Sequence, residues 1–164
     1  MSREVGVLDE YLSLGATPEL ESRWRKDMVN EYVQKAQEAD EHALTNLVLL
    51  EAVEALPALA ELVWKGDGFY RVRCAETIDQ LVGFPKDATS EAGAALQRAR
   101  QSCREIADGR FTDPGAVPRF VLELEGEEDP RSYVIERARR FLPERLPSRS
   151  LLGRMWSALF SRAV

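Results

Sequence analysis

The chain has 164 residues, of which 45% are hydrophobic and 30% charged, with a formal net charge of −6 and two cysteines. This length suits one globular domain, and the composition is typical of soluble globular proteins. Two cysteines and one histidine are too few for a disulfide framework or a structural zinc site. The first residues lack the pattern of a targeting peptide, and no apolar run approaches the ~18 residues of a membrane span, so we expect a cytoplasmic protein.

The charge is unevenly distributed along the chain. Residues 131–164 contain eight arginines and two glutamates, a net charge of +6, which leaves −12 on residues 1–130. An acidic body repels nucleic acid and attracts proteins with a basic surface. We therefore expect no nucleic-acid partner, and only the C-terminal region has the charge to approach phosphate groups or anionic lipid.

Two helices are predicted in the first third of the chain. Thr17 is the expected N-cap of the first, and Pro18 suits its first position. Its apolar residues recur every four positions, which places one set on its inner face: Leu20, Trp24, Met28 and Tyr32. Asp40 is the expected N-cap of the second helix, whose apolar surface is wide enough for the centre of the core: Leu44, Leu47, Val48, Leu50, Val53 and Leu56.

The break Gly66-Asp67-Gly68 separates a third helix from a fourth. The third begins near Pro57, and the apolar stripe of the fourth contains Val72, Ala75, Ile78 and Leu81. Three aromatic residues flank the break: Trp64, Phe69 and Tyr70. Aromatic side chains at such a turn either pack at the edge of the core or form a binding hot spot, and we take these three as candidate partner-binding residues.

Further helices are predicted towards the C-terminus. Ser90 is the expected N-cap of a helix that runs to about Ala107, and Asp129 is the expected N-cap of another. Residues 120–125 lie between them and alternate in the manner of a strand. We favour a helix here because no second convincing strand is available for pairing, although the sequence leaves both open.

The C-terminal region divides into a proline-containing linker and an amphipathic helix at residues 149–164. One face of this helix supplies further candidate partner-binding residues: Leu152, Met155, Trp156, Leu159 and Phe160. It either closes the end of the helical body or docks into a groove of a partner. A membrane-surface role for residues 149–164 is disfavoured but open, because two arginines lie within the helix itself. The expected organisation is a single helical domain at 1–142 followed by linker and helix at 143–164.

Residues 54–81 resemble a HEAT repeat. The matching features are Leu56-Pro57 with Leu59 and Leu62 in a first helix, Asp67 in the turn, and "VRCAETIDQL" from Val72 to Leu81 in a second helix. The resemblance implies that Asp67, with Arg71 or Arg73, bonds the turn and neighbouring repeats. Residues 115–142 follow the pattern less closely, with Ile135 and Glu136 at the arginine positions. The expected fold is therefore all-α, an irregular HEAT-like stack of antiparallel helix pairs with seven or eight helices.

No pattern in the sequence predicts a catalytic, cofactor or metal site. His42 is the single histidine and lacks the Glu-x-x-His spacing of helical metal sites. A nucleophile elbow and a phosphate-binding loop are absent from the sequence. Cys74 and Cys103 fall on apolar faces, and the acidic run at 123–129 lacks the frame of an EF-hand.

These features favour a non-enzymatic protein-binding module, an adaptor or assembly factor with an acidic helical body and a basic amphipathic C-terminal helix. The expected partner is another protein with a basic surface. The alternative is an immunity-type inhibitor that blocks a basic toxin or nuclease, since several such inhibitors are compact, acidic and helical.

Overall fold

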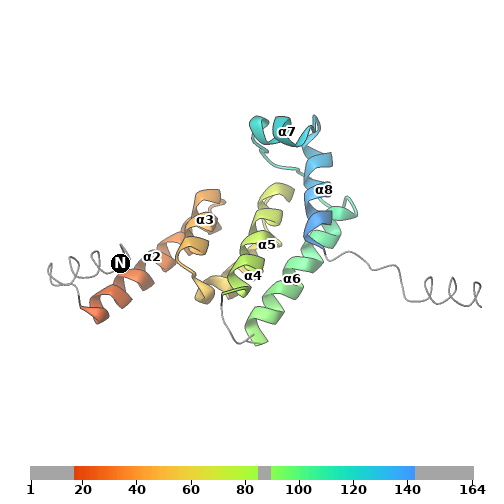
Figure 1. The fold of residues 1–164 in the computed structure, drawn as a ribbon. Helices are drawn as coiled ribbons and strands as arrows, with labels where there is room; N and C mark the ends of the chain where they lie inside the picture. Colours follow the sequence, from red (N-terminus) through yellow and green to blue (C-terminus); the bar gives the residue numbers. More distant parts are fainter. Residues whose placement is uncertain (1–16, 85–89, 143–164) are drawn as a thin grey trace, which may run out of the picture.

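The computed structural model describes residues 17–84 and 90–142. Within these ranges every regular element is helical and no strand occurs, which confirms the expected all-α fold (Figure 1). The described elements are α2 (Pro18–Gln37), α3 (Glu41–Leu49), the 3₁₀ helix η1 (Val53–Ala55), α4 (Leu56–Leu62), α5 (Gly68–Val82), α6 (Ser90–Ala107), α7 (Arg119–Glu125) and α8 (Pro130–Phe141). None of these helices is long and apolar enough to cross a lipid bilayer.

Helix α5 lies in the middle of the described structure. It packs against α3, α4, α6 and α8, and α6 also packs against α4 and α8. The helices succeed one another in space in roughly chain order, with α2 at one end and α7 and α8 at the other (Figure 1). The N-terminal helix α2 contacts mainly α3, so α5 and α6 connect the two ends.

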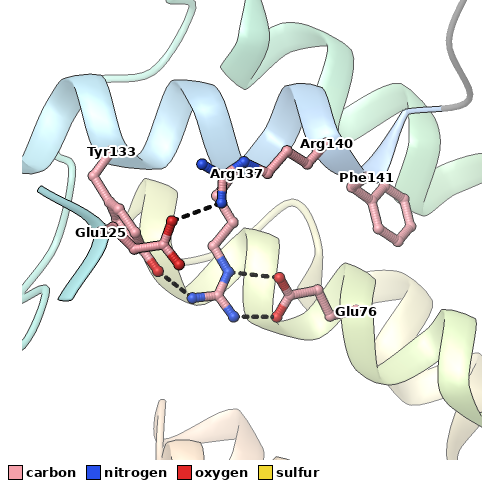
Figure 2. Close-up of a pocket in the computed structure, with 6 residues that line it drawn as sticks. All are labelled: Glu76, Glu125, Tyr133, Arg137, Arg140 and Phe141. Carbon is pink, nitrogen blue, oxygen red and sulfur yellow. Dashed lines mark hydrogen bonds and ion pairs between the residues drawn. The ribbon is translucent and has the colours of Figure 1, made fainter. Parts of the chain in front are cut away.

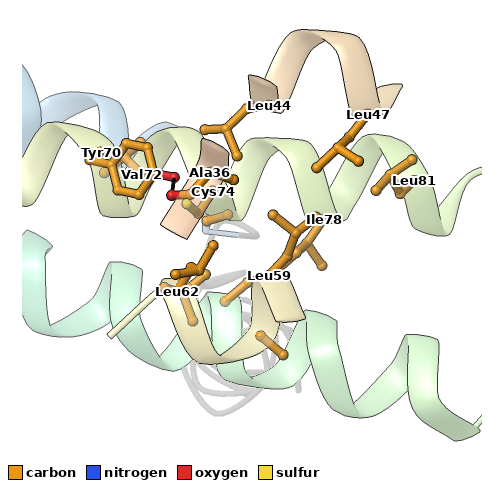
Figure 3. Packing of buried hydrophobic residues seen from close by; sticks show 14 of the residues in the cluster. Ala36, Leu44, Leu47, Leu59, Leu62, Tyr70, Val72, Cys74, Ile78 and Leu81 are labelled. Atoms are coloured by element: carbon orange, nitrogen blue, oxygen red, sulfur yellow. Dashed lines mark hydrogen bonds between the residues drawn. The ribbon is translucent and has the colours of Figure 1, made fainter. Parts of the chain in front are cut away.

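Aliphatic side chains from both sides of α5 form the core. Leu44 and Leu47 of α3 and Leu59 of α4 point towards Ile78 and Leu81 on α5 (Figure 3). All five are almost completely buried. Burial of each such side chain contributes about 1.5–3 kcal/mol, so this packing fixes the central position of α5.

The expected helix starts are confirmed by side-chain caps. Each cap accepts hydrogen bonds from amides of the first turn: Thr17 from Leu20 (3.3 Å), Asp40 from His42 (2.9 Å), Asp67 from Tyr70 (2.8 Å), and Asp129 from Arg131 and Ser132 (3.2 and 3.0 Å). These amides have no acceptor within their own helix, which is why short polar residues mark helix starts. Ser90, the N-cap expected for the next helix, is instead the first helical residue of α6.

The inner face of α2 differs from the one expected. Trp24 is 46% exposed and Met28 is 40% exposed, whereas Val29 and Ala36 are buried. The guanidinium of Arg25 donates to the Leu50 carbonyl oxygen at 3.0 Å and turns this side of the helix towards α3. Apolar periodicity was therefore wrong for Trp24 and Met28, whereas Tyr32 packs against the core as expected.

The second predicted helix is shorter than expected. It ends at Leu49 with Leu50 as its C-cap, and two of the residues that the sequence placed in it lie further on, Val53 in η1 and Leu56 in α4. Glu51 adopts a left-handed conformation with φ of 49°. The amide of Ala52 then bonds to the carbonyl of Leu47 at 3.0 Å, a pattern that closes helix C-termini and commonly contains glycine. No glycine or proline marks this end, so the sequence carried no visible stop signal.

Residues 120–125, for which helix and strand were both open, lie in the helix α7. Gly126 follows in a left-handed conformation and ends the helix. Leu122 is the buried residue of α7, at 8% exposure, and the other residues are half-buried or exposed. The helix is thus held by one buried side chain and leaves much of its surface uncovered by the described residues.

The segment at 113–115 closes over the N-terminus of α5. The amides of Gly68 and Phe69 donate to the carbonyls of Asp113 and Pro114 at 2.8 and 2.9 Å. Gly115 lies so close to the Asp67 carboxylate that an added Cβ would be 2.2 Å from Oδ1. The first amides of α5 therefore have acceptors both in the preceding residue Asp67 and in the distant segment 113–115.

We predict that Gly115→Ala lowers the free energy of unfolding by about 3 kcal/mol, from backbone strain at φ +88° and displacement of the Asp67 cap. Gly109→Ala is the matched control, because Gly109 has a similar φ of +74° and open space around it. It should cost only about 1–2 kcal/mol. Urea denaturation of both variants measures the difference, and equal losses would contradict the close approach.

Candidate functional site

The aromatic residues at the Gly66–Gly68 break lie mostly in the core. Phe69 and Tyr70 are each 4% exposed, and the Tyr70 hydroxyl donates to the carbonyl of Ala36 at the end of α2 (Figure 3). Burial also raises the pKa of Tyr70. Side chains so covered have little surface to offer a partner, so we place Phe69 and Tyr70 in the core. Trp64 is half-buried, with the guanidinium of Arg71 5.6 Å from its ring centroid.

Arg71 is a buried link between three helices. It is 8% exposed, and its Nε donates to the carbonyl of Val63 at the end of α4 at 3.0 Å. Its Nη2 donates to the hydroxyl of Ser102 on α6 at 2.9 Å. Glu105, also on α6, lies 3.7 Å away and balances part of the charge. The side chain thereby ties α5 to α4 and α6 at once.

Asp67 and Arg73 have separate contacts. Asp67 caps α5, while Arg73 points to Glu76 at 3.1 Å and to Glu41 on α3 at 3.9 Å. Arg71 therefore bonds the turn region and the next helix, and Arg73 reaches the preceding one. These contacts are of the kind that the HEAT resemblance implies for the aspartate and arginines, although the resemblance itself stays a prediction.

A cleft of ≈ 330 Å³ opens between α5, α7 and α8 (Figure 2). Its lining contains Glu76, Glu125, Tyr133, Arg137, Arg140 and Phe141. The charged groups in it are already paired. Arg137 forms two hydrogen bonds to the Glu76 carboxylate, at 2.5 and 2.8 Å, and Arg140 lies 2.8 Å from Glu125.

The paired charges give this cleft a structural role. Partial burial lowers the pKa of Arg137, but the hydrogen bonds and charge of Glu76 raise it by more, so the guanidinium stays charged at all ordinary pH values. Arg137 also bonds to the Tyr133 hydroxyl. A guanidinium held in a two-pronged bond has little freedom to bind another anion. The ion pair between Arg137 and Glu76 therefore joins α8 to α5.

The reactive residue types of the described chain are placed away from any common site. His42 is exposed on the first turn of α3, whereas Cys74 and Cys103 are completely buried. Burial raises the pKa of each thiol to about 12. Residues 17–84 and 90–142 contain no cluster of histidine, cysteine and acidic side chains suited to a metal ion.

One exposed region combines apolar and acidic groups, and we call it the α7 surface. It consists of Phe120, Glu123, Leu124, Glu127 and Glu128. Phe120 is 64% exposed and Leu124 is 82% exposed, one helical turn apart. The three glutamates line a cleft of ≈ 510 Å³ together with Arg119 and Leu122.

Sequence reasoning missed the α7 surface. The acidic run at 123–129 was considered as a cation site, and neither Phe120 nor Leu124 was assigned to an inner face. The available signal was the pair of large apolar residues four positions apart, beside acidic residues that no predicted helix buried. The candidates Leu152, Met155, Trp156, Leu159 and Phe160 lie outside the described residues.

We predict that Arg71→Met lowers the free energy of unfolding by about 2 kcal/mol, because bonds from a buried guanidinium to the Val63 carbonyl and Ser102 are lost. Arg98→Met is the control, since Arg98 bonds Glu61 with its side chain 45% exposed. Its effect should stay below about 1 kcal/mol. Chemical denaturation of both variants gives the comparison, and an equal or larger loss for Arg98→Met would refute the role of Arg71.

We also predict that neither thiol of the folded chain reacts readily with a soluble disulfide reagent at about pH 8, where an ordinary cysteine is partly ionised. A thiol with a pKa of about 12 carries almost no thiolate there, and both are shielded from solvent. The absorbance of the released chromophore measures the rate of thiol labelling, and this rate should rise as urea unfolds the chain. Immediate labelling of both thiols without urea would contradict the burial.

Comparison of the chain with protein-family models, with curated proteins and with solved structures found no match.

Proposed function

We propose that this chain is a non-enzymatic protein-binding module, an adaptor or assembly factor, that holds a basic partner at the α7 surface. The observation that carries this proposal is the pair Phe120 and Leu124, two large apolar side chains exposed on one side of α7. Side chains of this size gain about 1.5–3 kcal/mol each when they are covered. An exposed apolar group rimmed by polar residues is a common mark of a protein contact.

The charges around this pair indicate the class of partner. Glu123, Glu127 and Glu128 are close to the apolar pair along the chain and line a cleft together with Arg119, and the first 130 residues together have a net charge of −12. Potentials of opposite sign speed the encounter of two proteins and exclude partners of the wrong charge. A partner with an apolar centre and basic residues around it complements this arrangement.

The support beneath α7 favours a contact surface over a reaction site. Arg140 on α8 pairs with Glu125 at the end of α7, and Arg137 fixes α8 to α5. The charged groups of the deeper cleft are thus engaged in holding α7 and α8 in place. What they leave free to meet another molecule is the outer side of α7.

We predict that Phe120→Ser with Leu124→Ser weakens partner binding about 100-fold, because ~3 kcal/mol of apolar burial is lost. Leu49→Ser is the matched control, since Leu49 is 75% exposed on α3 at a distance from α7 in the fold. The partner is first identified by a photo-cross-linking amino acid at position 124, with position 49 as control. Titration of that purified partner then gives the dissociation constants.

The proposal requires the protein cross-linked at position 124 to be basic, and its affinity to fall as salt is raised. Equal cross-linking from positions 124 and 49, or an affinity unaffected by the double substitution, would overturn the α7 surface as the binding site.

A further inference from the structure

We propose that residues 149–164 of this same chain dock on the α7 surface when no partner is bound. The inference rests on the proposed function of that surface and adds its regulation. The C-terminal segment occupies the site, and a partner has to displace it. Three observations support this occupant: its apolar pattern, its charge and the place where the described chain ends.

The apolar patterns of the two segments match. Phe120 and Leu124 leave an apolar strip along one side of α7. The C-terminal segment has its large apolar residues at helical spacing, so that they share one face: Leu152, Met155, Trp156, Leu159 and Phe160. The strip on α7 is uncovered by the described residues, and packing the C-terminal segment against it would remove apolar surface of both from water.

The charges are complementary. Residues 149–164 contain three arginines, Arg149, Arg154 and Arg162, and no acidic residue. Among the described residues, Glu127 and Glu128 form no ion pair, whereas Glu123 is paired with Arg119 at 3.0 Å. Two carboxylates that follow the apolar strip closely in the chain are therefore available to arginines of the docking segment.

The end of the described chain lies within reach of α7. Arg140 is 2.8 Å from Glu125, the last residue of α7, and the described chain ends two residues later at Leu142. Residues 143–148 then span up to ~20 Å when extended. A tether this short gives an effective concentration on the order of millimolar, so even a weak contact is populated within one chain.

Other exposed apolar side chains fit this occupant less well. Leu49 borders a cleft of ≈ 290 Å³ in which the charged lining residue is Arg73, of the same sign as the segment. Trp24 and Met28 lie on α2, at the opposite end of the described structure from α8 (Figure 1). The α7 surface alone among these regions combines an apolar strip, acidic neighbours and proximity to Leu142.

The test uses the full chain with Leu124→Cys labelled by a bimane dye, whose emission is quenched when a tryptophan touches it. Cys74 and Cys103 are buried, so the dye labels the new cysteine. We expect Trp156→Phe to raise the emission of the dye at position 124. The same pair of chains labelled through Leu49→Cys should show no change, and Glu128→Lys should relieve part of the quenching at position 124.

An emission at position 124 that does not change with Trp156→Phe would overturn the proposal, as would an equal rise at position 49. Quenching that disappears on dilution would assign the contact to a second copy and would also overturn it. Cross-linking of a basic partner at position 124 without quenching by Trp156 leaves the proposed function standing and removes this inference. Quenching by Trp156 without a basic partner cross-linked at position 124 would support the docking of residues 149–164 and remove the proposed function.

Discussion

The N-terminus of α5 is the point on which the described fold depends. Its first amides donate to the Asp67 side chain and to the carbonyls of Asp113 and Pro114. One turn further on, Arg71 bonds the end of α4 and the middle of α6. A helix start is normally the part that frays, because its amides lack partners within the helix. Here chain segments from both sides of α5 supply those partners.

This arrangement determines which surface is left for other molecules. Because α5 is surrounded by α3, α4, α6 and α8, its side chains are used in packing. Arg137 and Glu76 attach α8 to α5, and the chain between α6 and α8 is drawn over the start of α5 at 113–115. Helix α7 therefore lies at the periphery and buries one side chain, Leu122. Its exposed apolar residues, Phe120 and Leu124, stay uncovered by the described residues.

Local signals in the sequence were sufficient for helix starts and insufficient for helix ends and faces. The caps Thr17, Asp40 and Asp129 act within three residues, so their roles could be predicted. The end of α3 depends on a left-handed Glu51, which has no residue-type signature.

The inner face of α2 depends on Arg25, whose partners lie 25 residues and more further along the chain. An exposed apolar strip such as that of α7 is recognised only once the neighbours of each helix are known, since apolar residues in a sequence are normally assigned to the core.

The most direct measurement is amide hydrogen exchange at Gly68, Phe69 and Tyr70 in the full chain. If the bonds to Asp113, Pro114 and Asp67 hold the start of α5, these three amides exchange only through global unfolding, with the same free energy as amides in the middle of the helix. If these amides exchange at the rate of a frayed first turn, independently of global stability, the start of α5 is not held by these bonds and the account is contradicted.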